Sequence, residues 1–362
     1  MVSLMGIPMP PAVEVRTPAR LHLGLLSFGD PALRAYGGLG VMVDAPGVVV
    51  RLRRHSEFSA AGPLGSRALA FARECVRAWG LGPEATCAIE VVAAPRAHVG
   101  LGSGTQLALA VAAGMRQLFC LAPQGQPAAV EALPVVGQQH FDTAAVISLA
   151  RGVGRGRRSS VGIHGFSGGG LIVEAGKYAP PPSAAAELEA GGGSHEVSPL
   201  VARVHLPAEW RCVVIIQRDA EGLHGEAEKA AFADLPPVER ALSAELARIA
   251  LMELVPAAAE GKFAEFAAAV GRYGQLAGVP FASHTAGLPQ TESTRQLLEL
   301  LAELGFCGSA QSSWGPAVMA CCATAQAAEQ LVETFQSRGL SGRHDLWITQ
   351  FDNRGAILRT LE

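Results

Sequence analysis

The sequence lacks several features that would place it at once in a common class of protein. Its longest apolar stretches, such as 107–115 and 212–216, are much shorter than the roughly 18 residues that cross a bilayer. The first eleven residues contain no basic segment followed by a sustained apolar run, so no signal peptide is expected and the cytoplasm is the expected location. The seven cysteines include no pair at CxxC spacing, which argues against a zinc or redox site and predicts buried thiols.

An excess of positive charge is also missing. The 29 Lys and Arg residues against 32 Asp and Glu leave a net charge of -3, so neither nucleic acid nor a membrane is expected as a partner. An anionic substrate must therefore be bound by a local cluster. The 49% of hydrophobic and 17% of charged residues exclude disorder, and a length of 362 residues suggests two domains.

The pattern along the chain mixes strands and helices. Alternating or apolar runs predict strands at 13–26 with a break at Pro18, and at 36–43, 47–53, 86–93, 171–175 and 210–217, with a final hairpin formed by 345–351 and 356–361. Helical periodicity or composition predicts helices at 65–79, 103–119, about 138–151, 224–234, 237–255, 261–275, 291–304 and 324–338. A glycine-rich tract covers 152–170, and the Pro-, Ala- and Gly-rich segment 179–200 predicts an exposed insertion near a domain boundary.

The sharpest chemical signal is the segment 95–110, PRAHVGLGSGTQLALA, where a strand leads through glycines directly into a helix. Glycines allow the backbone to approach an anion, and the first N–H groups of a helix lie unpaired at the positive end of its dipole. Ser103 is the expected N-cap. The predicted phosphate-binding residues are Gly100, Leu101, Gly102, Ser103, Gly104, Thr105 and Gln106. The alternative is that the glycines serve only a tight turn.

Two better-known glycine loops do not fit this segment. A Walker A loop ends in Gly-Lys-Ser/Thr, whereas Gly104 is followed by Thr105 and Gln106. A dinucleotide-binding fingerprint reads GxGxxG with an acid about 20 residues later, but this segment reads GxGxG and no acid occurs at 121–126.

Two further segments, TPARLHLG at 17–24 and GFCGSAQSSWGPAVM at 305–319, complete a set of three. Together the three segments resemble the motifs of the small-molecule kinase superfamily that includes galactokinase, homoserine kinase, mevalonate kinase and phosphomevalonate kinase. The resemblance implies an α+β, GHMP-kinase-like fold with a ribosomal-protein-like N-terminal domain at 12–200 and a ferredoxin-like C-terminal domain at 201–362. The active site would lie between the two domains.

In detail the chain resembles one branch that is not a kinase, the β-ribofuranosylaminobenzene 5′-phosphate synthase family of methanopterin biosynthesis. TPARLHLGLL, YGGLGVMVDAP, HVGLGSGTQLALA, GRGRRSSVGIHGFSGGGLIVEAG and SAQSSWGP carry this likeness. It implies transfer of a phosphoribosyl group from phosphoribosyl diphosphate to a para-substituted benzoate, 4-aminobenzoate or 4-hydroxybenzoate, with release of diphosphate and carbon dioxide. Magnesium is the implied ion.

One departure from the kinase pattern favours ribosyl transfer. Kinases of the superfamily often carry an Asp as a base in the stretch that corresponds to 157–166, which here contains no carboxylate but two adjacent arginines. Guanidiniums suit a leaving diphosphate. The predicted catalytic residues are Arg20, His22, Arg157 and Arg158, and the predicted substrate-binding residues are Asp44, Gln311, Ser312, Ser313 and Trp314. Glu226 and Glu228 are candidate magnesium ligands.

Each of these assignments has an ordinary alternative. Arg20 could be an ion-pair residue, His22 a core histidine, Trp314 core packing, and Glu226 and Glu228 helix-surface charge. For the whole chain the alternatives are an ATP-dependent kinase of the same fold and a nucleotide-sensing protein without catalysis. The para substituent, the magnesium ligands and the oligomeric state stay open at this point, with a homodimer as one option.

Overall fold

Two β-sheets organise the protein in a computed structural model that describes residues 11–119, 138–178, 196–220, 222, 230–232, 234–282 and 289–361. The strands of the larger sheet are β1 (Ala12–Ser27), β2 (Arg34–Arg54), β3 (Ser59–Ala61), β4 (Cys87–Ala93), β5 (Gln138–His140), β6 (Leu171–Glu174), β7 (Lys177–Tyr178), β8 (Leu200–Val204) and β13 (Ile357–Leu361). Its main order is β3-β4-β2-β1-β13-β5, while β6 and β7 pair with β2 and β8 pairs with β6.

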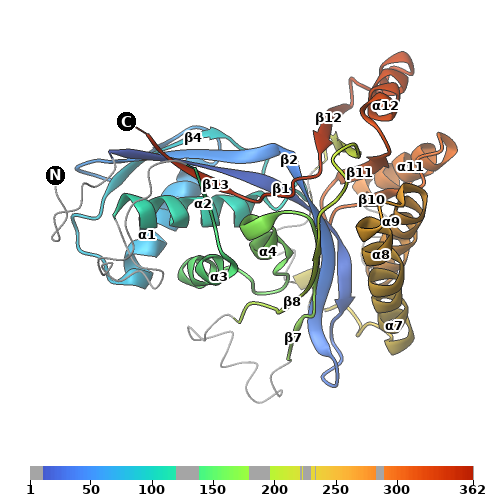
Figure 1. Cartoon of the computed structure of the whole chain (residues 1–362), viewed down its shortest axis with the longest axis horizontal. Helices are drawn as coiled ribbons and strands as arrows, with labels where there is room; N and C mark the ends of the chain where they lie inside the picture. The colour runs from blue at the N-terminus through green and yellow to red at the C-terminus, as the bar shows by residue number, and fades with distance from the viewer. Residues whose placement is uncertain are drawn as a thin grey trace.

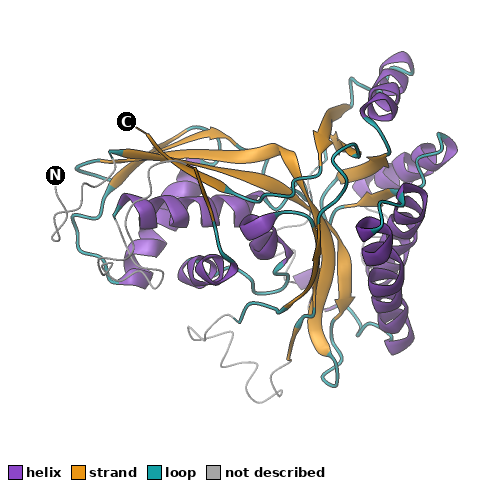
Figure 2. Ribbon diagram, viewed as in Figure 1, coloured by secondary structure: helices purple, strands orange, loops and turns teal. Residues whose placement is uncertain are grey.

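The smaller sheet has the order β10-β11-β9-β12. Its strands are β9 (Arg211–Gln217), β10 (Ser309–Gln311), β11 (Ala317–Cys322) and β12 (His344–Gln350). Figure 1 and Figure 2 show how the helices divide between the sheets. Beside the larger sheet lie α1 (Gly65–Trp79), α2 (Ser103–Leu118), α3 (Thr143–Gly152) and α4 (Val161–Gly168). On the other side of the molecule lie α7 (Arg240–Ile249), the π-helix η1 (Ala250–Leu254), α8 (Val255–Ala259), α9 (Phe263–Gly278), η2 (Val279–Phe281), α11 (Pro289–Glu303) and α12 (Ala325–Ser337). This arrangement confirms the α+β fold class, and no helix of the described chain is long and apolar enough to span a membrane.

The long hairpin of β1 and β2 connects the two halves. Val13 and Val15 pack in one hydrophobic core with α1 and α2, whereas Leu21 and Leu23 pack in a second core with α9. The predicted break at Pro18 is wrong, because β1 runs through it. Proline lacks an N–H, and Pro18 lies within a register shift of the β1–β2 ladder, where no ladder bond is needed from it. The predicted strands at 36–43 and 47–53 are likewise one continuous strand, β2.

The predicted C-terminal hairpin is also wrong. β12 pairs with β9 in the smaller sheet, and β13 pairs with β1 in the larger sheet. In the turn between them, Asp352 Oδ1 accepts hydrogen bonds from the backbone N–H of Arg354 (3.1 Å) and Gly355 (2.6 Å). The domain division at residue 200 stays a prediction, although β8, which begins at Leu200 and crosses it, and β13, which follows it, both belong to the larger sheet.

Most predicted helices are confirmed, with two differences. The helix expected from about 138 begins only at Thr143, after β5, where Asp142 accepts from the N–H of Ala145 as N-cap. Helix α4 lies unexpectedly inside the glycine-rich tract. Its glycines permit close packing, because a Cβ at Gly165 would lie 2.2 Å from Met42 Sδ of β2. Tertiary packing therefore outweighs the low helix propensity of glycine here. Most of the predicted helix at 224–234 and residues 179–195 of the predicted insertion lie outside the described residues.

Candidate functional site

The three sequence motifs meet at one place. The backbone N–H of Arg20 on β1 donates to the carbonyl of Leu101 (3.0 Å), which joins the first motif to the glycine turn. The N–H of His22 donates to Ser312 Oγ (2.9 Å), and the N–H of Ser313 donates to the carbonyl of His22 (3.0 Å), which joins the first motif to the third. Segments that lie far apart in the sequence thus form a single site beside the start of α2.

The first turn of α2 leaves two backbone N–H groups without an acceptor inside the helix. Gly102, in the left-handed region at φ 67°, is the N-cap of α2, so the prediction of Ser103 as N-cap is wrong. The carbonyl of Gly102 accepts from the N–H groups of Thr105 (3.0 Å) and Gln106 (3.1 Å). The N–H groups of Ser103 and Gly104 precede these, and helix geometry supplies them with no internal acceptor. They lie at the positive end of the helix dipole, where an anion is stabilised.

Two guanidiniums lie against the glycines of this turn. A Cβ at position 102 would lie 3.0 Å from Arg20 Nε, and a Cβ at position 104 would lie 2.9 Å from Arg67 Nη2. Arg20 also donates from Nη1 to Ser313 Oγ (2.9 Å). The glycines therefore do more than allow a turn, because they let two positive side chains approach the bare helix start. Arg67 was missed from the sequence, since an arginine on an amphipathic helix resembles ordinary surface charge.

The third motif packs backbone to backbone on the glycine turn. Ser312 Oγ donates to the carbonyl of Gly100 (2.7 Å), and a Cβ at Gly100 would lie 2.4 Å from the carbonyl oxygen of Ser312. A Cβ at Gly315 would lie 2.3 Å from the nitrogen of Gly100. Gln311 Nε2 donates to the carbonyl of Gly315 (2.9 Å), so its amide stabilises its own loop. Ser312 and Gln311 thus hold the turn in shape, while Ser313 is exposed beside Arg20.

Three residues of the predicted phosphate-binding set are buried, Ser103 among them. Leu101 is almost fully covered, and its carbonyl accepts from Arg20. Gln106 is fully buried, and its Nε2 donates to the carbonyl of Gly162 (2.9 Å) at the start of α4. Their contacts connect α2 to β1 and α4, whereas Gly104 and Thr105 lie closer to the surface.

A buried polar chain runs beneath the first motif. His22, only 4% exposed, has Nε2 at 3.0 Å from Ser159 Oγ, and Ser159 donates to Glu174 Oε1 (2.7 Å). Burial, and secondarily the charge of Arg20, hold the pKa of His22 well below its usual 6.5. Burial raises the pKa of Glu174, against the lowering effect of its hydrogen bonds. Glu174 was not found from the sequence because it reads there as the end of an apolar strand.

Arg157 and Arg158, the two adjacent arginines, lie in different surroundings. Arg157 is exposed, and its carbonyl accepts from Lys177 Nζ (3.0 Å). The Arg158 guanidinium carbon lies 4.4 Å above the ring of Phe232, a cation–π contact. Trp314 lies with its ring 5.4 Å from that of Phe232 and 4.8 Å from that of Phe281. Trp314 is therefore part of an aromatic cluster with Phe232 and Phe281. Arg158 contacts this cluster at Phe232.

Asp44 makes its contacts away from the turn. Its Oδ1 accepts from the Thr349 hydroxyl and from the N–H of Gln350 (3.0 Å), which links β2 to β12. Glu226 and Glu228 lie outside the described residues. Within the described ranges no group of three or more His, Cys, Asp or Glu side chains is placed to hold a metal ion.

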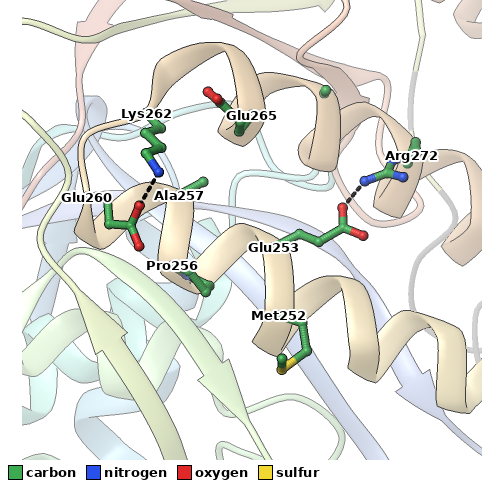
Figure 3. A pocket seen from close by; sticks show the side chains of 9 residues that line it. Met252, Glu253, Pro256, Ala257, Glu260, Lys262, Glu265 and Arg272 are labelled. Carbon is green, nitrogen blue, oxygen red and sulfur yellow. Dashed lines mark ion pairs between the residues drawn. The ribbon is translucent and has the colours of Figure 1, made fainter.

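A groove elsewhere on the molecule is separate from this site. A groove of about 660 Å³ lies between the η1–α8 segment and α9, and Figure 3 shows the side chains that line it. Its lining includes an ion pair between Glu253 and Arg272 and another between Lys262 and Glu260 (2.5 Å). None of the three motifs contributes to the lining. The convergence of donors and guanidiniums, rather than hollow volume, marks the candidate site.

The buried histidine makes stability depend on pH. His22 titrates at its usual pKa when unfolded, so below about pH 6.5 the unfolded chain binds a proton that the folded chain excludes. Stability should therefore fall as the pH falls below 6.5, by up to about 1.4 kcal/mol per pH unit until the folded pKa is reached. Urea unfolding at pH 7.5 and 5.5 measures the loss, and His22→Asn should reduce it. The exposed His140, changed to Asn, is the control; equal losses in both variants would contradict the assignment to His22.

Several known proteins are similar to this chain in sequence or in fold. The family model described as "GHMP kinases C terminal" matches residues 254–340. The β-ribofuranosylphenol 5′-phosphate synthase of Methanothermobacter thermautotrophicus is 28% identical over 314 residues, which cover 84% of this chain and 87% of that protein. The protein of the same name from Archaeoglobus fulgidus is 29% identical over 266 residues, which cover 73% of this chain and 76% of that protein.

Solved structures agree on the fold. Mevalonate pyrophosphate decarboxylase from Streptococcus pyogenes matches with a TM-score of 0.62 at 13% identity, covering 96% of this chain and 98% of that chain. Homoserine kinase from Cytophaga hutchinsonii matches with a TM-score of 0.59 at 15% identity, covering 97% and 98%. The chain therefore has the fold of the GHMP kinases, matches their C-terminal family model over residues 254–340, and is similar over most of its length to the β-ribofuranosylphenol 5′-phosphate synthases.

Proposed function

We propose that this protein is a β-ribofuranosylphenol 5′-phosphate synthase of methanopterin biosynthesis. It transfers the phosphoribosyl group of phosphoribosyl diphosphate to 4-hydroxybenzoate and releases diphosphate and carbon dioxide. Similarity to synthases of that name over most of the chain supports the reaction. The observation that carries it in the structure is the start of α2, where two helix N–H groups without an internal acceptor and the guanidiniums of Arg20 and Arg67 lie together at the glycine turn.

The chemistry needs charge stabilisation at the leaving group. The bond from ribose C1 to the diphosphate oxygen breaks, and its electron pair goes to diphosphate. The ring carbon that bears the carboxylate then forms a bond to C1, carbon dioxide leaves, and the electron pair of the broken bond returns to the ring. The N–H groups of Ser103 and Gly104, with Arg20, neutralise the growing negative charge where it develops, which lowers the barrier.

The acceptor is placed by ring contacts and a nearby cation. The aromatic cluster of Phe232, Phe281 and Trp314 offers an apolar wall, and Arg158, which lies over Phe232, is the cation that we assign to the benzoate carboxylate. A phenol product requires the 4-hydroxy acceptor, which we favour over 4-aminobenzoate on the names of the relatives. Magnesium bound by the substrate diphosphate is part of the proposal.

A kinase of the same fold is the second candidate, because homoserine kinase shares the architecture. A phosphoryl acceptor hydroxyl benefits from a base. In the described part of the 157–174 region the only carboxylate is Glu174, which is fully buried and bonded to Ser159 and Ser160. This arrangement favours loss of diphosphate over phosphoryl transfer.

A product assay separates the two functions. The protein incubated with phosphoribosyl diphosphate and carboxyl-labelled 4-hydroxybenzoate should yield labelled carbon dioxide, diphosphate and the riboside phosphate, identified by mass spectrometry. A parallel incubation with 4-aminobenzoate measures acceptor preference. Formation of ADP from ATP and small alcohols, with no riboside from either benzoate, would reject the synthase.

Arg67 should contribute to binding of phosphoribosyl diphosphate. Its guanidinium lies at the Gly104 end of the turn, and loss of one charge-assisted hydrogen bond costs about 1.5 kcal/mol or more. Arg67→Ala should therefore raise KM for phosphoribosyl diphosphate about tenfold. Arg73→Ala, an exposed arginine on the same helix, is the matched control and should leave KM unchanged. Steady-state kinetics decide, and an unchanged KM in both variants would remove Arg67 from the site.

A further inference from the structure

A fully buried glutamate lies beneath the two segments that carry the site's arginines. Glu174 is the last residue of β6, and it has no exposed surface. Its Oε1 accepts from Ser159 Oγ (2.7 Å) and from the backbone N–H of Ser160 (2.7 Å). These two residues join Arg158 to the first turn of α4. The carboxyl group therefore anchors the chain directly after the arginine pair.

The hydroxyl of Ser159 extends this anchor to β1. A serine hydroxyl has one hydrogen and two lone pairs. Its hydrogen goes to Glu174, and its lone pairs face the N–H of Val161 (3.2 Å) and His22 Nε2 (3.0 Å). Because the hydrogen of Ser159 is already used, His22 must be the donor from Nε2. The hydroxyl of Ser159 therefore uses its hydrogen and both lone pairs in hydrogen bonds. These bonds determine that neutral His22 carries its hydrogen on Nε2.

His22 in turn is linked to the residues that touch the proposed diphosphate site. Its backbone bonds to Ser312 and Ser313 of the third motif. It lies two residues after Arg20, and side chains two apart on a strand point to the same side. Arg20 rests on Gly102 and donates to Ser313. One carboxyl group thus connects the start of α4 with the strand and loop that hold Arg20.

We propose that Glu174 is a positioning residue of the phosphate site, which through Ser159 and His22 holds Arg20 and the Arg158 segment in one arrangement around the glycine turn. The identity of the ligand rests on the proposed function. Burying a carboxyl group lowers the free energy of unfolding unless hydrogen bonds or charges compensate for its lost hydration. The other three residues of β6 are apolar. A glutamate at position 174 is explained if its Oε1 is needed to accept the hydrogen bonds from Ser159 and Ser160.

Glu14 provides a matched control for this proposal. It is another buried glutamate, on β1 of the same sheet, and it pairs with Arg16 (2.7 Å) and Arg51 (2.8 Å). None of its hydrogen bonds reaches the three motifs. Replacing either glutamate should lower the melting temperature, but only Glu174 should affect phosphate ligands.

The test compares variants by titration of inorganic diphosphate in a calorimeter and by KM for phosphoribosyl diphosphate. Glu174→Ala and Ser159→Ala should each weaken both about tenfold. Glu174→Gln should restore both to within about threefold of wild type, because the amide oxygen still accepts from Ser159 and Ser160. The double variant with both alanines should bind no more weakly than Glu174→Ala, since the two changes break one connection. Glu14→Ala should leave both quantities unchanged.

Several results would overturn the proposal. Wild-type diphosphate affinity in Ser159→Ala and Glu174→Ala would do so, and so would equal weakening in Glu14→Ala. If Glu174→Ala does not fold, Ser159→Ala and Glu174→Gln still decide the question. If the wild-type protein makes no riboside, the proposed function fails, while the diphosphate titrations continue to test the positioning role independently.

Discussion

Arg20→Ala should lower kcat/KM for phosphoribosyl diphosphate about a thousandfold, the largest effect we expect from a single side chain. The guanidinium lies against Gly102 and is oriented by Ser313 Oγ at 2.9 Å. It can thus meet the diphosphate where charge develops on the leaving oxygen. Removing one such preorganised donor costs about 3 to 4 kcal/mol in the transition state, or two to three orders of magnitude in rate.

The control for this prediction lies on the same strand. Arg16 is exposed and pairs with Glu14. Arg16→Ala should therefore keep the wild-type kcat/KM. Arg20→Lys should recover only part of the loss, since an ammonium keeps the charge but lacks the planar fork that binds phosphate oxygens in pairs. A decrease of less than about threefold in Arg20→Ala would mean that this arginine does not contact the leaving group.

Gly315→Ala should both destabilise the protein and nearly abolish its activity. The added methyl group would lie 2.3 Å from the nitrogen of Gly100 and from the carbonyl carbon of Val99. These are backbone atoms, so the clash is relieved only if the third motif and the glycine turn move apart. Overpacking of this kind costs about 1 to 3 kcal/mol of folding free energy. The same displacement would misplace Arg20, whose backbone bonds to Leu101.

Gly278→Ala is the matched control, because a Cβ at that position near the end of α9 meets nothing within 4 Å. It should be neutral or stabilise by up to about 1 kcal/mol, since alanine is the better helix former. Urea unfolding gives the stabilities, and kcat/KM measured where both variants are folded gives the activities. Wild-type activity in Gly315→Ala would show that the contact between the two loops is not needed for catalysis.

Local sequence was sufficient for the features whose geometry is local. The glycine turn before α2 could be predicted because its three alternating glycines and the helix-forming segment after it lie close together in the sequence, so that no distant contact is needed to form them. The cap was misassigned by one residue, because the turn uses Gly102 in the left-handed region rather than the side chain of Ser103.

Features that depend on contacts across the chain were missed or misplaced. Strand pairing is decided by distant partners, and so β12 and β13 join different sheets although their sequence resembles a hairpin. Arg67 and Glu174 carry no motif, and their meaning arises only where α1 and β6 pack against the turn and α4. Asp44 lies next to a recognisable motif, yet its contacts are with β12.

The residues alone determined the class of fold, the three motifs, and the position of a helix start suited to a phosphate. The helix start follows from helix-forming composition and from glycine's freedom at positive φ, which are properties of short segments, while the three motifs and the class of fold follow from the resemblance to the kinase superfamily. The tertiary structure decided which charges meet at that helix start. It brought Arg20 and Arg67 to the turn, set His22 in a buried polar chain that ends at Glu174, and placed Asp44 elsewhere, because packing and desolvation depend on every neighbour in space.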